Sequence, residues 1–544
     1  MGIDARAGLV SPGVRHWARR RFRHIARDES KKRGSSQVRG QERRRRLLLV
    51  HLDGVPIQVL RAAIDDGTMP FLGRLVRSGA YRLDAAFWGS PASTPAFQAG
   101  VLYGLRHPNL PAYHWYDREL GRTVHMNVPR DTVAIEERLA SSHPESLLSG
   151  GGRSYLSLFR AGAENQAAMT ALANLRELSR TVRRELRGLG GPARQGLWAW
   201  AQAVAKDTWS TVLDVRDWGR GLGGDFRHER EYLINRLLMM SMAWNVAHSR
   251  ALIDLVRGVP VVYLVFGNYD EVAHRRGPLS HQALAQLARV DRELEELYAF
   301  SRLSSPAYDV IFVTDHGHVE SVPFEQRQPL SLPETLCREG RTVLDPSLEA
   351  ALLDGRGRPA PVAGSRLHVP EVVEAGNFAH VYLERGPEPL EAAALLSGSH
   401  REVLARIACH PDIGIAAVRR GEQAVALIGG RVYGPGELAS APLDAEYNRH
   451  ALADLLHELP HMKTAGDVVI YGQAAGPART VGFAWEFGSH GGLTHAEVDS
   501  AILWPLDGAV RGEDLTHVLQ LHERLAGAYL DTPRAFRRGR ELHG

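Results

Sequence analysis

Four short, nearly continuous runs of apolar residues recur along the chain, and they constrain its fold more than any other feature. They cover residues 47–52, 261–266, 309–313 and 468–471. A run of this kind is typical of a strand whose two faces are both buried, as in a parallel sheet. Helical or irregular stretches separate the runs. We therefore predict an α/β fold, a sandwich with a mostly parallel central sheet and helices on both faces.

The length of 544 residues accommodates one large α/β domain with insertions. The pattern turns helical over residues 163–256, which predicts a helical insertion. Residues 335–465 alternate short strand-like and helical pieces, which predicts a smaller α/β insertion. Both insertions belong to one domain over residues 47–544, preceded by a basic tail over residues 1–46. Four tryptophans at helical spacing in the first insertion favour packing core over a membrane interface: Trp198, Trp200, Trp209 and Trp244.

Positive charge is concentrated at the N-terminus. Residues 1–50 hold fifteen Lys and Arg against four Asp and Glu, whereas the other 494 residues carry a net charge of about −7. Residues 15–46 contain few apolar side chains, so we expect a flexible arm. Two interpretations stay open, a solvated tail without a partner and attraction to anionic lipid or nucleic acid. No specific nucleic-acid partner is expected.

Cysteine content and the absence of long apolar stretches bear on location. Cys337 and Cys409 are the only cysteines, which fits a reducing compartment. The N-terminus lacks the apolar stretch of about 7–15 residues found in secretory signals. No run approaches the ~20 apolar residues of a membrane-spanning helix. The sequence predicts a cytoplasmic protein, with peripheral contact to an anionic membrane through the basic tail as an additional option.

Acidic and histidine side chains gather in four segments, each of them just after a predicted strand. Alone, each is explained by a turn, a helix cap or a surface histidine, but the coincidence in four segments favours a shared site. Carboxylate oxygens and imidazole nitrogens are ligands for zinc or manganese, and two such ions need about six or seven of them. The candidates are Asp53, Asp270, His274, Asp315, His316 and His490.

Five motifs occur in order: an Asp after the first strand, a Ser/Thr before a helix, Asp-x-x-x-His, Asp-His-Gly and a late Gly-x-His-Gly. This ordered set resembles the alkaline phosphatase superfamily. The Asp-x-x-x-His spacing followed by Gly277-Pro278 is most similar to its type I phosphodiesterase/nucleotide pyrophosphatase branch, and the motifs extend from residue 47 to about 505. The resemblance implies an alkaline-phosphatase-like sandwich and a hydrolase of phosphodiester or pyrophosphate bonds. It also implies two divalent metal ions, Zn²⁺ first and Mn²⁺ as the alternative. One ion would be held by Asp53, Thr94, Asp315 and His316, and the other by Asp270, His274 and His490.

The nucleophile implied by the resemblance is Thr94, which would form a phosphothreonine intermediate. Pro95 is well tolerated in the first turn of a helix. The start of a helix carries partial positive charge, which favours an anionic phosphoryl oxygen. Ser93 is the alternative, because many members of the superfamily place the nucleophile two residues before the proline. Gly104, which is similar to the family glycine that closes this helix, favours Thr94.

Substrate preference stays open at this stage. The asparagine that binds a phosphate oxygen in the diesterase branch has no clear equivalent, and the candidates for that contact are Asn109, His114 and Trp115. A phosphomonoesterase would want an extra cation, for which the candidates are Arg106, Arg275 and Arg276. His318 and Glu320 are expected to support the ligands or to face solvent. The expected partner is a small phosphoester, a nucleotide or a lipid head group. A catalytically inactive, basic-tailed binding protein for membrane or nucleic acid is the alternative from another class.

Overall fold

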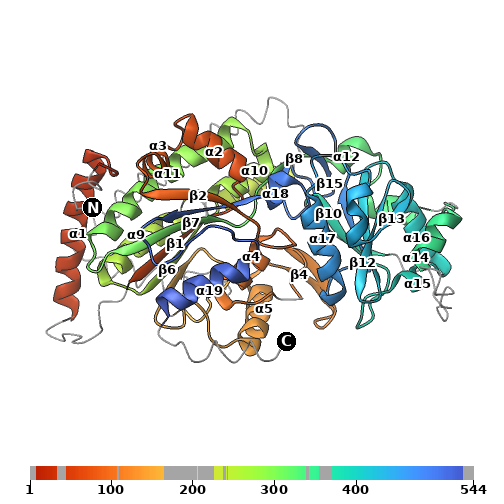
Figure 1. Ribbon diagram of the computed structural model, residues 1–544, viewed down its shortest axis with the longest axis horizontal. Coiled ribbons are helices and arrows are strands. Elements are labelled where there is room, and N and C mark those ends of the chain that lie inside the picture. The colour runs from red at the N-terminus through yellow and green to blue at the C-terminus, as the bar shows by residue number, and fades with distance from the viewer. Residues whose placement is uncertain are drawn as a thin grey trace.

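Two lobes lie along the long axis of the molecule, a larger one around a sheet covered by helices and a smaller one around a second sheet (Figure 1). The computed structural model describes residues 8–33, 45–106, 109–163, 205, 226–236, 241, 243–338, 342–353 and 370–530. The N-terminal helix lies at the outer end of the larger lobe, away from the smaller one.

The central sheet has six strands in the order β2-β17-β7-β1-β6-β5. The neighbours β7, β1, β6 and β5 are parallel, whereas β17 pairs antiparallel with both β7 and β2. Three of the predicted runs are therefore confirmed as adjacent strands of a mostly parallel sheet. The strand bounds are β2 (Tyr81–Ala86), β17 (Ser500–Pro505), β7 (Tyr308–Thr314), β1 (Arg46–Leu52), β6 (Val261–Phe266) and β5 (Arg153–Tyr155).

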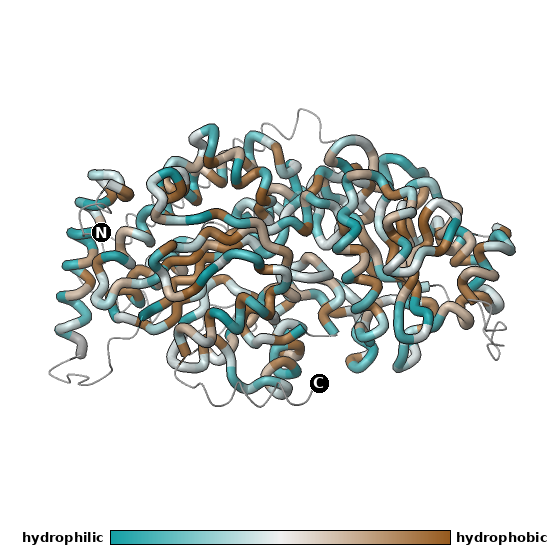
Figure 2. The backbone as a smooth tube through the Cα atoms, in the orientation of Figure 1, coloured by the Kyte–Doolittle hydropathy of each residue, from teal (hydrophilic) through white to brown (hydrophobic). Residues whose placement is uncertain are grey.

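Helices cover both faces of this sheet, because successive side chains of each apolar strand point to opposite faces. Leu48 and Val50 of β1 pack on one face, and Leu47 and Leu49 pack on the other. The hydrophobic strands stand out between more polar helices (Figure 2). The first face packs against α2 (Ile57–Asp65), α3 (Pro70–Arg77), α9 (Trp244–Arg257), α10 (Asn268–Arg276) and α11 (His281–Leu303). The second packs against α4 (Thr94–Tyr103), α5 (Pro129–Ser142) and α19 (Val518–Tyr529).

The second sheet is antiparallel, in the order β13-β12-β11-β14-β10-β9. Its strands are β13 (Arg431–Tyr433), β12 (Gln423–Ile428), β11 (Ile413–Arg420), β14 (Val468–Gly472), β10 (Phe378–Tyr382) and β9 (Glu371–Ala375). The assignment of residues 468–471 to the central parallel sheet is therefore wrong. A fully buried apolar run does not specify which sheet it joins. The smaller lobe extends past residue 465, where the α/β insertion was predicted to end.

Part of the predicted flexible tail is an ordered helix, α1 (Pro12–Arg33). Its apolar side chains recur at helical spacing, and Trp17, Phe22 and Ile25 pack on the core formed with α9 and α11. The prediction of a flexible arm is wrong for this segment. Net charge concealed an amphipathic pattern, because five of the basic residues are exposed while the apolar side chains pack on the core.

Most of the predicted helical insertion, including Trp198, Trp200 and Trp209, lies outside the described residues. Its described elements, α8 (Phe226–Asn235) and α9, are both helices. Trp244 is buried, with its ring centroid 4.1 Å from that of Phe266, so this tryptophan belongs to the core. Among the described helices, none is both long enough and apolar enough to cross a membrane. The cytoplasmic location stays a prediction of the sequence.

Two small sheets contact elements of both lobes. One contains β15 (Arg479–Gly482), β8 (Val319–Pro323) and β16 (Gly488–Ser489), in that order. The other is a hairpin of β3 (His114–Asp117) and β4 (Arg122–His125). Residues from both sheets lie near the site described below.

A buried histidine of β10 predicts acid sensitivity. His380 accepts a hydrogen bond from the backbone N–H of Gly466 (3.1 Å) and lies 3.4 Å from the carbonyl of Pro111. Burial lowers its pKa to about 3. Since the unfolded histidine titrates near pH 6.5, unfolding takes up a proton below that pH, and stability is lost as the pH falls from about 6.5 toward 3. The loss at pH 4.5 amounts to about 2–3 kcal/mol.

His380→Gln measures this contribution. We expect the free energy of unfolding in urea to fall less between pH 7.5 and 4.5 in the variant than in the wild type, by about 2 kcal/mol. If the free energy of unfolding depended equally on pH in the two proteins, the pKa of His380 would not be lowered in the folded state.

Candidate metal and nucleophile site

The predicted ligands meet at one edge of the central sheet. Because β7, β1 and β6 are parallel neighbours, their carboxyl ends lie side by side. Asp53 directly follows β1, Asp315 directly follows β7, and α10 begins two residues after β6. The backbone turns sharply after Asp53 at Gly54, which has φ +71°, and a Cβ there would lie 2.5 Å from Asp270 Oδ1. Glycine thus lets the turn and the Asp270 carboxylate approach each other.

The hydroxyl of Thr94 faces this edge. Helix α4 begins at Thr94, with Ser93 in extended conformation as its N-cap, and it ends at Gly104 in left-handed conformation. Thr94 Oγ1 lies 3.1 Å from His316 Nε2 and 3.4 Å from Asp53 Oδ1. The predicted helix start and its closing glycine are both confirmed.

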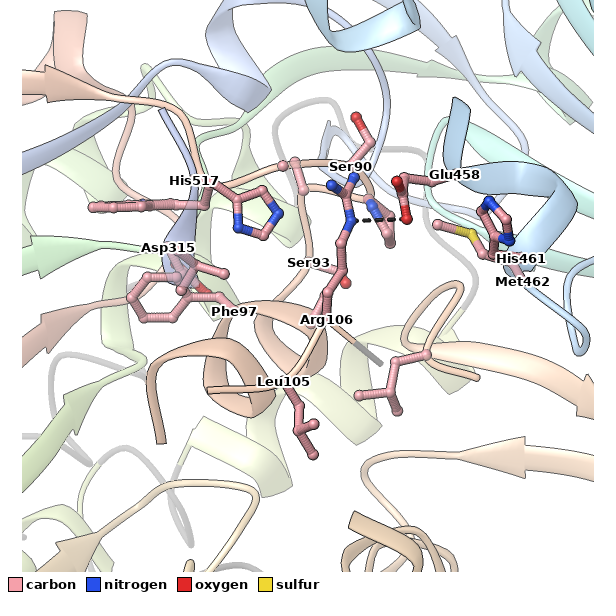
Figure 3. Close-up of a pocket in the computed structure, with 17 residues that line it drawn as sticks. Ser90, Ser93, Phe97, Leu105, Arg106, Asp315, Glu458, His461, Met462 and His517 are labelled. Carbon is pink, nitrogen blue, oxygen red and sulfur yellow. Dashed lines mark ion pairs between the residues drawn. The ribbon is translucent and has the colours of Figure 1, made fainter. Parts of the chain in front are cut away.

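The hydroxyl of Ser93 has different surroundings. Ser93 lines a cavity of about 190 Å³, with Phe97, Arg106 and His517 among its other walls (Figure 3). Thr94 does not line that cavity. Ser93 Oγ is buried and has no hydrogen-bond partner among the described residues. Of the two hydroxyls, only that of Thr94 contacts the acidic and histidine cluster in the described structure.

The remaining predicted ligands complete the cluster. Asp270 and His274 are one turn apart on α10, with His274 Nε2 3.6 Å from Asp270 Oδ2. His490, which follows β16, has its Nε2 4.0 Å from Asp270 Oδ1. Its ring stacks on that of His316, with the centroids 3.8 Å apart. The structure therefore brings together all seven side chains that the sequence grouped: Asp53, Thr94, Asp270, His274, Asp315, His316 and His490.

Hydrogen bonds orient two imidazoles so that Nε2 faces the cluster. His316 Nδ1 lies 3.1 Å from the carbonyl of Gly317. His274 Nδ1 lies 3.1 Å from both the carbonyl of Gly488 and the carboxylate of Glu486. Because these neighbours only accept hydrogen bonds, Nδ1 carries the proton in both rings. In each ring, Nε2 is therefore the nitrogen left to bind a metal ion once it carries no proton.

Two further histidines support the carboxylates, and the sequence did not assign either of them as a ligand. His318 Nε2 lies 2.7 Å from Asp270 Oδ1. His51 Nε2 lies 3.1 Å from Asp315 Oδ1, and its Nδ1 lies 2.7 Å from the hydroxyl of Tyr263. His51 looked like an ordinary strand residue in the sequence, whereas His318 next to Asp-His-Gly was a visible signal.

The electrostatics of the cluster fit divalent cations. Burial, followed by the charges of Asp315 and Asp270, raises the pKa of Asp53 well above its usual value. Burial also opposes ionisation of Asp270, but the charges of His274, His318 and His490 outweigh it and hold the pKa of Asp270 well below the usual value. Without a cation, the carboxylates share protons with one another and with the imidazoles. A metal ion would supply the positive charge that these buried groups lack.

Two sets of carboxylate and imidazole donors lie close enough to hold an ion, and each combines groups from different chain segments. Their ligand atoms fall within 4.8 Å of one another. The first set is His51, Asp53 and Asp315, and the second is Asp270, His316, His318 and His490. These sets differ from the division that the resemblance implies, because His316 falls in the second set and His274 falls in neither. The donor types suit zinc or manganese.

The described part of the helical insertion holds the helix that carries Asp270 and His274. The buried carboxylate of Glu229 on α8 accepts hydrogen bonds from Arg275 and Arg276 at the end of α10. Asn235 of α8 donates to Glu271 at 2.7 Å. Contacts across these helices therefore restrain both ends of α10.

The arginines considered as extra phosphate contacts are already engaged. Arg275 and Arg276 pair with Glu229. Arg106 pairs at 2.9 Å with Asp454 and with Glu458, and Figure 3 shows the second of these pairs. None of the three is therefore a free cation for a dianionic phosphate.

The candidate substrate contacts separate into buried and site-facing residues. Trp115 is fully buried and Asn109 is 8% exposed. His114 lies among charged neighbours that include Glu486 and His274. Tyr113, which the sequence did not single out, has Glu271, Asp53 and Asp270 as its acidic neighbours. Tyr113 and His114 therefore lie near the cluster.

A serine or threonine hydroxyl at a helix start, surrounded by carboxylates and imidazoles at the carboxyl edge of a parallel sheet, defines an alkaline-phosphatase-like phosphoester hydrolase. The chain belongs to the type I phosphodiesterase / nucleotide pyrophosphatase family, whose sequence profile matches residues 47–408. The match includes six of the seven clustered side chains, all but His490.

Solved structures with low sequence identity resemble the chain along most of its length. Phosphonoacetate hydrolase from Sinorhizobium meliloti 1021, in complex with phosphonoformate, is 16% identical, with a TM-score of 0.44 and coverage of 91% of this chain and 98% of that one. Murine ectonucleotide pyrophosphatase / phosphodiesterase 5, in complex with AMP, is 11% identical, with a TM-score of 0.45 and coverage of 92% and 99%. No curated protein sequence matches the chain significantly.

Proposed function

We propose that the chain hydrolyses phosphodiester or pyrophosphate bonds with two divalent cations and with Thr94 as its nucleophile. The single observation that supports this most is the position of Thr94 Oγ1, 3.1 Å from His316 and 3.4 Å from Asp53 within a buried acidic cluster. A hydroxyl in such surroundings is suited to losing its proton to form a nucleophile.

Seven side chains would hold the two cations. Asp53, Thr94, Asp315 and His316 would bind one, and Asp270, His274 and His490 the other. Divalent cations bound there would polarise the phosphoryl oxygens and lower the pKa of the Thr94 hydroxyl. Zn²⁺ is the first candidate because imidazole and carboxylate donors are mixed, and Mn²⁺ is the alternative.

The residues of the chain have distinct roles in this proposal. Thr94 Oγ1 attacks phosphorus, the alcohol or phosphate of the substrate leaves, and water then hydrolyses the phosphothreonine. The start of α4 faces the phosphoryl group with the positive end of its helix dipole. His51 orients Asp315, and His318 orients Asp270. The carbonyl of Gly488 accepts a hydrogen bond from His274 Nδ1, and Glu486 lies 3.1 Å from the same nitrogen, so Nε2 is the nitrogen that would bind the cation.

A diester or pyrophosphate fits the surroundings better than a phosphomonoester does. A monoester dianion brings one more negative charge to an edge that already holds Asp53, Asp270 and Asp315. The arginines that were candidates for its extra contact are paired with carboxylates. The hydroxyl of Tyr113 and the imidazole of His114 are neutral contacts, since burial lowers the pKa of His114 to about 4.

The test compares four chromogenic esters with the full-length protein loaded with Zn²⁺ or Mn²⁺. We expect kcat/KM for bis-p-nitrophenyl phosphate to exceed that for p-nitrophenyl phosphate by at least about tenfold. The monoester carries one more negative charge, and without a cation to pair with it that charge costs more than about 1.4 kcal/mol. The p-nitrophenyl esters of thymidine monophosphate and of phosphocholine then separate a nucleotide from a lipid head group. Preference for the monoester would make the protein a phosphomonoesterase. No turnover by the metal-loaded protein would contradict the proposal and favour a binding protein.

A further inference from the structure

The N-terminal helix α1 is fixed to the body of the larger lobe. The backbone N–H of Ser11, just before α1, donates to the carboxylate of Glu295 on α11. Trp17 and Phe22 pack against the ring of Phe300, with centroid distances of 5.5 Å and 5.9 Å. Glu29 near the other end binds Arg257 at 2.9 Å. These contacts anchor both ends and the middle of the helix, so its outward side has a defined direction.

The outward side of α1 is a row of basic side chains, which we call the basic face. It consists of Arg19, Arg20, Arg23, Arg27 and Lys31, all of them exposed. Because these positions recur about every four residues, they lie along one side of the helix. The helix of 22 residues is about 33 Å long at 1.5 Å per residue. It lies at the outer end of the larger lobe, with hydrophilic residues along much of its length (Figures 1 and 2).

No acidic side chain in the described part of the chain pairs with the basic face. The two acidic residues of α1 are directed elsewhere, Asp28 toward His24 at 3.6 Å and Glu29 toward Arg257. Among the described ion pairs, none includes a residue of the basic face. The face therefore presents about five uncompensated positive charges at one end of a protein whose residues 51–544 are net negative.

We propose that the basic face is a docking surface for an anionic lipid membrane, bound by charge and without insertion of α1. The apolar side of α1 already packs on the core, so it is not available to enter the bilayer. A straight row of arginines on the outside of one end matches a flat anionic surface, which it can contact along its whole length. Such contacts strengthen binding about fivefold for each Lys or Arg near the surface.

A membrane fits these observations better than a nucleic acid does. Surfaces that bind single strands combine basic grooves with exposed aromatic rings, but the aromatic rings of α1, Trp17 and Phe22, are turned toward Phe300. The exposed residues of α1 include no Asn or Gln to read base edges. A nucleic acid longer than the helix would also approach the acidic remainder of the protein, whereas a flat surface touches only the end.

The experiment is co-sedimentation of the full-length protein with vesicles of phosphatidylcholine alone or with one third phosphatidylglycerol. The test variant is Arg19→Glu/Arg23→Glu/Arg27→Glu. The control variant, Arg61→Glu/Arg338→Glu/Arg431→Glu, makes the same change of charge at three exposed arginines outside α1. Turnover of bis-p-nitrophenyl phosphate and the melting temperature show that both variants are folded. The docking proposal does not depend on the proposed hydrolysis, and vesicle binding is measured without substrate.

We expect the wild type and the control variant to bind the anionic vesicles at 50 mM salt and to bind phosphatidylcholine at least about tenfold more weakly. The basic-face variant should lose about 100-fold in affinity for anionic vesicles, and 500 mM salt should release the wild type. Equal binding by the basic-face variant would overturn the proposal. So would an absence of vesicle binding, or a basic-face-dependent affinity for duplex DNA or RNA in place of vesicles.

Discussion

Thr94→Ala is expected to lower kcat for bis-p-nitrophenyl phosphate by at least about 10³-fold, because removal of a nucleophile leaves only the residual catalysis of binding and electrostatics. The side chain is 6% exposed, and its hydroxyl is the one directed at Asp53 and His316. KM should change by much less than kcat, since the substrate phosphate would still be held by the cations. The measurement is steady-state kinetics of the zinc-loaded variant beside the wild type.

Two neighbouring variants control this result. Thr94→Ser keeps a hydroxyl at the same position and should retain measurable turnover. Ser93→Ala removes the hydroxyl that lines the cavity and should stay within about threefold of the wild type. Loss of turnover in Ser93→Ala together with activity in Thr94→Ala would transfer the nucleophile to Ser93 and contradict the geometry of α4.

Removal of the metal ions is expected to abolish turnover and to destabilise the fold. Each ion present at about 1,000 times its Kd stabilises the native state by about 4 kcal/mol. Its loss leaves the partly buried Asp53 carboxylate beside Asp270 and Asp315 without a counter-charge. Differential scanning calorimetry before and after chelation, and again after addition of Zn²⁺, measures the effect. An unchanged melting temperature after complete metal removal would show that no stabilising ion had been bound.

The metal-free protein should also respond to pH in a defined direction. The pKa of Asp53 is raised in the folded metal-free state, so this carboxyl binds more protons there than in the unfolded chain. The contribution of Asp53 to stability therefore falls as the pH rises from about 3.8 through the raised pKa, and His274, whose pKa is raised to about 10, contributes in the same direction above pH 6.5. Chelation should lower the melting temperature more at pH 8 than at pH 5. A larger fall in melting temperature at pH 5 than at pH 8 would contradict the excess of negative charge that we assign to the metal-free cluster.

The sequence predicted the part of the fold where local pattern and topology agree. Residues 47–52, 261–266 and 309–313 are strands because nearly every side chain in them is apolar, and parallel pairing then brought Asp53, Asp270 and Asp315 to one edge. The run at 468–471 has the same composition but pairs antiparallel in the second sheet. Which strands pair with one another depends on contacts between segments far apart in the chain. A run of apolar residues does not encode those contacts.

The sequence predicted those site residues that belong to an ordered motif. It did not predict those that reach the site only through tertiary contacts. Asp315 and His316 stand in a recognisable Asp-His-Gly turn. Glu486 and Tyr113 approach the cluster only because β16 and the β3 hairpin fold against it. Their residue types are common in loops, and nothing in their neighbours along the chain indicates a role at the site.

The most direct measurement of the central claim is anomalous diffraction at the zinc edge from crystals of the zinc-loaded protein. The account predicts two peaks at the carboxyl edge of the central sheet. One should lie among Asp53, Thr94, Asp315 and His316, and the other among Asp270, His274 and His490. A single peak, or no peak among these side chains in protein that still hydrolyses a diester, would contradict a two-metal site built from these seven residues.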